Sequence, residues 1–202
     1  MENETQLQDF YLPSVTKMRL FLMMGAILYT FGSIAGLQDL NGVIFGFTFP
    51  SLFIISGYVV LWESDDTEKR ILRTIRRTAI CFVILGICYF GLSLVLEPSY
   101  TLATISTKKF WFDFILLNVW SLPIGSTIWF VQSLLYAYII IYVIYKLKLL
   151  RFDILFVVLC LAVTLLTGEL ASVVGVNFFG HNCIGGNFLT RALPYILIGC
   201  FI

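Results

Sequence analysis

The chain has 202 residues, of which 59% are hydrophobic and only 12% are charged, and its mean hydropathy is +0.94. Soluble domains carry about 25% charged residues, because their surfaces face water. The composition therefore excludes a soluble globule and predicts an integral membrane protein of the all-α class, a polytopic transmembrane helix bundle. A net charge of +1 leaves no basic surface for nucleic acid, so that class of partner is excluded.

The membrane spans are predicted from apolar length. A helix needs about 20 apolar residues to cross a hydrocarbon core roughly 30 Å thick. Four charge-free segments are long enough, a fifth is shorter, and a sixth begins where the given sequence stops. The predicted spans cover residues 20–37, 41–62, 78–96, 127–145, 154–167 and 192–202. We therefore expect five spans plus the start of a sixth, in one partial domain over residues 1–202 that is truncated at its carboxyl end.

The segment from Phe110 to Trp120 is interpreted as interfacial and not as a further crossing, because Asp113 and Asn118 interrupt it. Under this interpretation most basic loop residues fall on one side of the membrane, as the positive-inside rule requires. The amino terminus is thus predicted to lie in the cytoplasm, and residues 97–109 are predicted to form an outward-facing loop. The cytoplasmic side would carry Lys17, Arg19, Lys69, Arg70, Arg73, Arg76, Arg77, Lys146, Lys148 and Arg151.

The loop over residues 63–77, which precedes the third span, holds an arginine pattern. Arg70, Arg73 and Arg77 recur at spacings of three and four, so they share a face if the helix extends into this loop, with Arg76 beside them. Guanidinium groups pair bidentately with phosphate, so the stripe could hold the phosphates of a cytoplasmic donor. The alternative is topological anchoring, helical ion pairing or attraction to anionic membrane lipid.

Polar side chains within two spans indicate an inward-facing cavity. Ser56 and Tyr58 lie in the second span near Pro50, at a depth where polar groups need a partner. In the fourth span, Trp129 and Gln132 belong to a polar and aromatic stripe at spacings of three and four. We expect these side chains to line one cavity, although a kinked, packed helix and an interfacial aromatic belt explain the same residues.

Small residues and metal ligands carry less information. Gly42 and Gly46 are spaced one turn apart, which allows close helix packing in membranes. His181 and Cys183 form too small a cluster for a metal, which usually takes three or four protein ligands. The sequence therefore predicts no metal site.

Three motifs and the arginine loop resemble the bacterial membrane acyltransferase 3 family of cell-envelope O-acetyltransferases. The first motif is similar to the family's plFfflSGY helix and is followed directly by R-x-x-R. The next two are similar to its lWFl-x-x-L-l-x-Y and r-x-lPyfllG helices. In this chain the motifs are Phe49–Tyr58, Thr127–Tyr136 and Arg191–Gly199.

The resemblance implies a multi-pass protein of the bacterial cytoplasmic (inner) membrane, surrounded by lipid. It implies transfer of an acyl group, expected to be acetyl, from acyl-CoA to a hydroxyl of a cell-surface carbohydrate or a lipid-linked sugar. The arginines at positions 70, 73, 76 and 77 would then bind the donor, and Ser56, Tyr58, Trp129 and Gln132 would line the substrate cavity.

The first span departs from the family pattern. The family places a basic residue and, ten residues later, a histidine proposed as the general base. Arg19 matches the basic position, but Thr30 stands where the histidine is expected. A hydroxyl attacking a thioester must lose its proton to a group that titrates near neutrality, which threonine does not do. Either the site uses another base, or the chain is a degenerate membrane subunit or scaffold that binds glycan or lipid.

Overall fold

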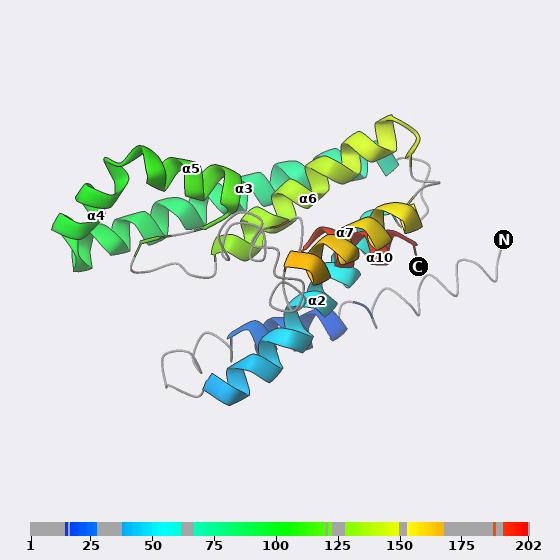
Figure 1. Cartoon of the computed structure of the whole chain (residues 1–202), viewed down its shortest axis with the longest axis horizontal. Coiled ribbons are helices and arrows are strands. Elements are labelled where there is room, and N and C mark those ends of the chain that lie inside the picture. The colour runs from blue at the N-terminus through cyan, green and yellow to red at the C-terminus, as the bar shows by residue number, and fades with distance from the viewer. Residues whose placement is uncertain are drawn as a thin grey trace.

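The computed structural model describes residues 15, 17–27, 38–61, 67–119, 121–122, 128–149, 153–167, 188 and 192–201, which form helices and short connections without a strand (Figure 1). Residues 17–27 form the first helical segment. The remaining elements are α2 (Gln38–Leu61), α3 (Thr67–Leu96), α4 (Pro98–Ile105), α5 (Lys108–Leu117), α6 (Ile128–Lys146), α7 (Asp153–Thr167) and α10 (Leu193–Phe201). The bounds of α2, α6, α7 and α10 nearly coincide with four predicted spans.

The helices α3 and α6 are the two described helices with the length and composition to cross a membrane. The 30 residues of α3 extend over about 45 Å. Its apolar window has a mean hydropathy of 2.6. Large side chains on it are exposed, among them Ile87 at 66% and Val95 at 79%. The core helix of a soluble protein would bury these side chains, so their exposure indicates a lipid-facing helix.

The third helix begins earlier than the span predicted for it. It is continuous from Thr67, so the segment over residues 67–77 is helical and not a loop. Glu68 occupies its first turn, where a carboxylate is stabilised by the helix dipole. The helix therefore extends over the arginine pattern, as a shared face requires, and Arg70, Arg73 and Arg77 lie on one helix.

Two short helices cover the carboxyl-terminal end of α3. The helix α4 lies in the segment predicted to be an outward-facing loop, and Pro98 starts it without losing a hydrogen bond. The Thr101 hydroxyl donates to the Ser93 carbonyl of α3 at 3.0 Å, which fixes α4 against α3. The ten residues of α5 extend over only about 15 Å. That length is too short for a crossing, as predicted for this segment.

The main core lies between α2, α3, α6 and α10. It is built from Phe49, Phe53 and Val60 of α2, Ile71 of α3, Ala137, Tyr138, Ile141 and Ile144 of α6, and Leu193, Ile196 and Leu197 of α10. The rings of Phe49 and Phe53 pack against Phe130 with centroids 5.3 and 4.9 Å apart. This aromatic contact joins α2 to the beginning of α6.

A reciprocal glycine contact joins α2 to α10. A Cβ atom added at Gly57 would overlap the carbonyl of Ile196, and one added at Gly199 would overlap the carbonyl of Ile54. The two backbones are therefore in direct contact, as small residues allow between membrane helices. Gly46, by contrast, has no atom within 4 Å of such a Cβ. The motifs Phe49–Tyr58 and Arg191–Gly199 thus meet at Gly57 and Gly199.

The helices α3 and α6 are antiparallel with a defined register, and they lie side by side in Figure 1. At one end, Lys146 pairs with Glu68 at 2.6 Å. At the other, Ile128 is the nearest neighbour of a Cβ placed on Gly86, at 3.8 Å. By this register Arg73 and Arg77 lie at the level of Ile141 and Ala137. The part of α3 beyond Gly86 extends past α6, and α5 lies along that part.

Candidate functional site

A buried polar cluster lies where the first helical segment, α2 and α6 meet. Ser56 of α2 and Tyr138 of α6 are each 4% exposed, and their side chains form a hydrogen bond. Buried hydroxyl groups at membrane depth need such a partner, because there is no water to receive them. The positive charge of half-buried Arg19 acts on the Tyr138 hydroxyl. Of the predicted site residues, Ser56 therefore contacts Tyr138 directly, and Arg19 acts on Tyr138 through its charge.

The sequence pattern did not point to Tyr138. The polar and aromatic stripe predicted on this span comprised Trp129, Gln132, Ser133 and Tyr136, and it did not include Tyr138, which is buried with Ala137 and Ile141. Its spacing of three to Ile141 was a usable signal, because it places a phenol on the apolar face of the helix. The sequence does not show which helix faces Tyr138. Only the packing of α6 on α2 identifies Ser56 as the partner of Tyr138.

The other wall of the cluster is formed by α10. The Cys200 thiol donates to the Gly57 carbonyl at 3.7 Å, and its side chain also acts electrostatically on Tyr138. Tyr58 is half-buried, and its backbone nitrogen lies beside Gly199. The glycine contact therefore brings α10 directly against the segment that carries Ser56. The closeness of these backbones leaves space at this point only for small groups.

Gln132 and Trp129 occupy a different place, at the junction of α5 and α6. The Gln132 amide donates to the Phe114 carbonyl at 2.5 Å and to the Tyr136 hydroxyl at 3.1 Å. The Tyr136 hydroxyl donates in turn to the Ile115 carbonyl at 2.7 Å. These carbonyls belong to the last turn of α5 and have no partner within the helix. Gln132 thus completes the end of α5.

Asn118 completes the same junction from the other side. Its left-handed backbone, with φ of 57°, caps α5, a conformation that asparagine adopts more readily than most residues. Its amide donates to the Trp129 carbonyl and to the Ser133 hydroxyl of α6. The indole of Trp129 packs on Phe49 of α2, with ring centroids 5.2 Å apart. Trp129 and Gln132, which the sequence predicted to line the cavity, therefore lie at the α5–α6 junction.

The arginines lie on the outer side of α3. Ile71 is fully buried against the core and marks the inner face of the helix, while Arg73, Arg76 and Arg77 are exposed and Arg70 is half-buried. By the α3–α6 register these charges lie level with an apolar stretch of α6. Guanidinium groups at such a depth need water or anions beside them. The stripe is consequently suited to contact a phosphate group.

The charged ends of α3 and α6 are tied together beside this stripe. Glu68 accepts from Lys146 and, at 3.4 Å, from the Tyr142 hydroxyl. The hydrogen bond from Lys146 is the main reason why the pKa of Glu68 lies below its usual value. The same bond raises the pKa of Lys146 above its own. Both side chains are charged at neutral pH and fix the register of the two helices.

Two residues named in the sequence analysis lie outside the part of the chain that the structure describes. Thr30, where the resemblance expects a histidine, lies outside the described residues. His181 also lies outside them. Within the described ranges no group of three or more His, Cys, Asp or Glu side chains could hold a metal ion.

A comparison with protein families finds one that covers almost the whole chain. The family model described as an acyltransferase domain, acyltransferase 3, matches residues 14–202. No curated protein and no solved structure matches the chain. The matched range includes every element of the fold and all of the site residues described above.

Proposed function

Because this chain belongs to the acyltransferase 3 family, we propose that it is a multi-pass enzyme of the bacterial inner membrane that transfers an acyl group, expected to be acetyl, from acyl-CoA to a hydroxyl of a cell-surface carbohydrate. Family membership supports a membrane acyltransferase in general. The observation that supports the proposal further is the buried, hydrogen-bonded pair of Ser56 and Tyr138, on which the positive charge of half-buried Arg19 acts.

The reaction transfers the acyl group from the coenzyme sulfur to the acceptor oxygen. The acceptor oxygen attacks the thioester carbonyl carbon, the new C–O bond forms, and the C–S bond breaks with departure of the coenzyme thiolate. The acceptor loses a proton, and the thiolate gains one. A cation near the reacting carbonyl stabilises the negative charge that develops on its oxygen. We assign this role to Arg19, and we assign the positioning of the acceptor hydroxyl to Ser56 and Tyr138.

The donor is proposed to bind at the arginine stripe of Arg70, Arg73, Arg76 and Arg77. The phosphates of acyl-CoA match the bidentate geometry of guanidinium groups. The arginine stripe lies level with an apolar part of α6, which supports donor binding at the stripe. An anionic ligand would lower the free-energy cost of placing these charges beside an apolar surface. The carbohydrate, whether free or linked to a lipid, would reach the cluster from the opposite side.

The proposal is tested by assaying membranes with radiolabelled acetyl-CoA and measuring label in envelope carbohydrate. Arg73→Gln with Arg76→Gln should raise the KM for acetyl-CoA at least about tenfold, since a hydrogen bond to a charged group contributes about 1.5–3 kcal/mol. Tyr138→Phe should lower kcat with little change in that KM. The matched controls are Lys148→Gln and Tyr145→Phe, which leave the stripe and the cluster intact. Unchanged kinetics in both test variants would contradict the assignments.

A second function, that of a catalytically degenerate subunit or scaffold, is favoured by one observation in the sequence. Thr30 supplies no group that titrates near neutrality. The variant Thr30→His separates the two possibilities in the same assay. Transfer by the unaltered chain contradicts a degenerate scaffold. Transfer only by Thr30→His would mean that the scaffold has kept its donor and acceptor sites but lost its base.

A further inference from the structure

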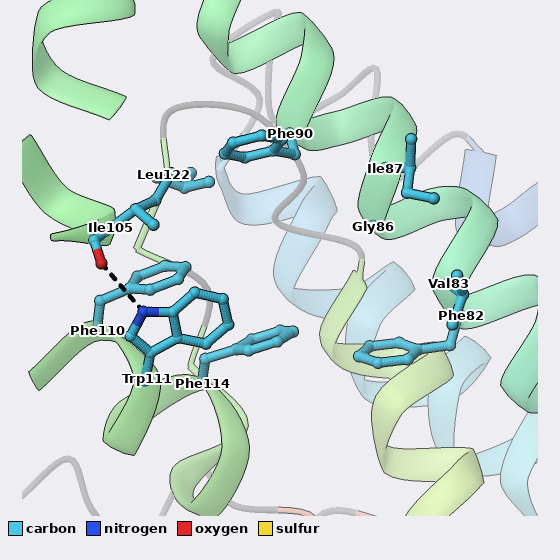
Figure 2. Close-up of a pocket in the computed structure, with 10 residues that line it drawn as sticks. All are labelled: Phe82, Val83, Gly86, Ile87, Phe90, Ile105, Phe110, Trp111, Phe114 and Leu122. Carbon is cyan, nitrogen blue, oxygen red and sulfur yellow. Dashed lines mark hydrogen bonds between the residues drawn. The ribbon is translucent and has the colours of Figure 1, made fainter. Parts of the chain in front are cut away.

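A cavity of about 320 Å³ lies between α3, α4 and α5, away from the polar cluster (Figure 2). Its volume falls within the range of small-molecule sites. Apolar side chains line it throughout, with Phe82 and Ile87 on the wall formed by α3 and with Phe110, Trp111 and Phe114 on the wall formed by α5. A cavity without polar groups does not hold ordered water, so its natural contents are hydrocarbon.

The aromatic wall of the cavity is ordered by its own contacts. The rings of Phe110 and Phe114 are stacked at 5.9 Å, and Phe114 stacks on Phe82 at 5.8 Å. The Trp111 indole donates to the Ile105 carbonyl at 3.0 Å, as Figure 2 shows. The cavity is therefore held open by paired rings and by a fixed indole.

Gly86 provides the space on the opposite wall. Gly86 lines the cavity, and a Cβ at this position would meet only the end of the Ile128 side chain, at 3.8 Å. Beside it on α3, Val83 is 55% exposed and Ile87 is 66% exposed. The mouth of the cavity therefore opens on the face of α3 that its hydropathy assigns to lipid.

Positive charge stands at one end of this cavity. Lys108 and Lys109 occupy the first turn of α5, directly before the lining residues Phe110 and Trp111, and both lysines are exposed. In the part of the chain that the structure describes, neither of these two lysines forms an ion pair of the kind that joins Glu68 to Lys146. An apolar cavity next to two cations is complementary to an anionic amphiphile.

We propose that this cavity binds one hydrocarbon chain of an anionic phospholipid, with the lipid phosphate held by Lys108 and Lys109. Basic side chains at the membrane surface attract anionic lipid, which favours it over zwitterionic lipid. Trp111 lies between the two parts of the ligand, at the level where tryptophan is enriched in membrane proteins. This site is separate from the Arg19, Ser56 and Tyr138 cluster and does not depend on catalysis.

The test uses the purified full chain in detergent, with phosphatidylglycerol and phosphatidylcholine carrying brominated acyl chains as probes. Bromine quenches tryptophan fluorescence on contact. We expect phosphatidylglycerol to quench the fluorescence at a concentration at least about threefold lower than phosphatidylcholine does, because the lysines attract only the anionic head group. The part of the quenching that comes from Trp111, one of four tryptophans, should be lost in Trp111→Phe. Equal quenching by the two lipids, or full quenching in Trp111→Phe, would overturn the proposal.

Two pairs of variants assign the tail and the head group. Gly86→Leu fills the cavity and should weaken the binding of both lipids, whereas Gly91→Leu, on the same helix in open space, should not. Lys108→Gln with Lys109→Gln should remove the preference for phosphatidylglycerol but retain the quenching, whereas exposed Lys17→Gln should change neither. The lysine pair lies at the surface, so it tests the site even if Gly86→Leu does not fold. Retention of the preference without both lysines would refute the head-group assignment.

Discussion

At the scale of single residues, the ion pair between Glu68 and Lys146 makes stability dependent on pH. The folded chain lowers the pKa of Glu68 below 4.5 and raises the pKa of Lys146 above 10.5, in both cases chiefly through their mutual hydrogen bond. The contribution of Glu68 is complete above 4.5 and is lost as the pH falls through its folded-state pKa. That of Lys146 is complete below 10.5 and is lost as the pH rises through its own. The pair therefore stabilises the fold between these limits.

The variant Glu68→Gln tests this dependence. It should lower the Tm of the detergent-solubilised chain at about pH 7 and should match the unaltered chain at a pH well below 4.5. The effect should be small, because both side chains are partly exposed to solvent and are screened by it. Exposed Glu97 provides the matched control, since its side chain makes no capping hydrogen bond. A Tm difference between Glu68→Gln and the unaltered chain that stays constant from about pH 3 to about pH 9 would contradict this explanation.

Residue chemistry also sets how far the candidate site could be anticipated. Arg19 and Ser56 were predictable because charge and hydroxyl groups stand out in apolar sequence. Tyr138 was not, because a tyrosine in a membrane helix is ordinarily interpreted as an interfacial residue and becomes informative only beside Ser56. Gln132 was predicted to line the cavity, and it stands at the α5–α6 junction because its amide completes the end of α5. A side chain that supports a helix end has the same sequence signature as one that binds substrate.

At the scale of helices, the direct backbone contact between α2 and α10 predicts sensitivity to a single methyl group. Gly57→Ala would place its Cβ against the Ile196 carbonyl, which belongs to a helix and has no freedom to move aside. The two helices must separate, and overpacking of this kind destabilises by about 1–3 kcal/mol. The expected result is a lower Tm together with weaker packing around Ser56, one residue away.

Gly46→Ala is the matched control, on the same helix and in open space. Alanine is favoured over glycine within a helix by about 1 kcal/mol, so this variant should retain or slightly raise the Tm. Thermal unfolding of both variants in the same detergent gives the comparison. Equal Tm values for Gly46→Ala and Gly57→Ala would mean that the α2–α10 contact does not contribute to stability.

The positions of the helices were largely predictable, whereas their partners were not. Apolar length predicted where the helices α2, α6, α7 and α10 lie, because it is a property of each segment alone. The spacing of Gly42 and Gly46 allows close packing, but a Cβ on Gly46 would have no neighbour within 4 Å, and α2 makes a direct backbone contact at Gly57, against α10. The helix α4 was missed because Thr101, which fixes it, depends on the Ser93 carbonyl of another helix.

At the scale of the whole molecule, the length of α3 predicts where its two ends lie. Its extent of about 45 Å equals the thickness of a bilayer including the head groups. One end is tied to Lys146 and the other leads into α4. The α4–α5 turn and the end of α6 should therefore lie on opposite sides of the membrane, with the end of α6 in the cytoplasm.

Single cysteines check this topology in a chain whose five native cysteines are replaced. Ser106→Cys and Lys148→Cys are both at exposed positions. A membrane-impermeant maleimide added to intact cells should label Ser106→Cys, and it should label Lys148→Cys only after the membrane is opened. Labelling of both positions in intact cells would refute the assignment of α3 as a crossing helix.

The end-to-end junction of α5 and α6 has a consequence for biogenesis. A segment as short as α5 does not partition into lipid as an independent span, because its terminal carbonyls would enter hydrocarbon without donors. The donors that satisfy Phe114 and Ile115 are Gln132 and Tyr136, which leave the ribosome later. We therefore expect α5 to dock only once α6 has been inserted, whereas α4 can dock earlier, because Thr101 fixes it to α3. The order of translation thus dictates the order of assembly in this half of the protein.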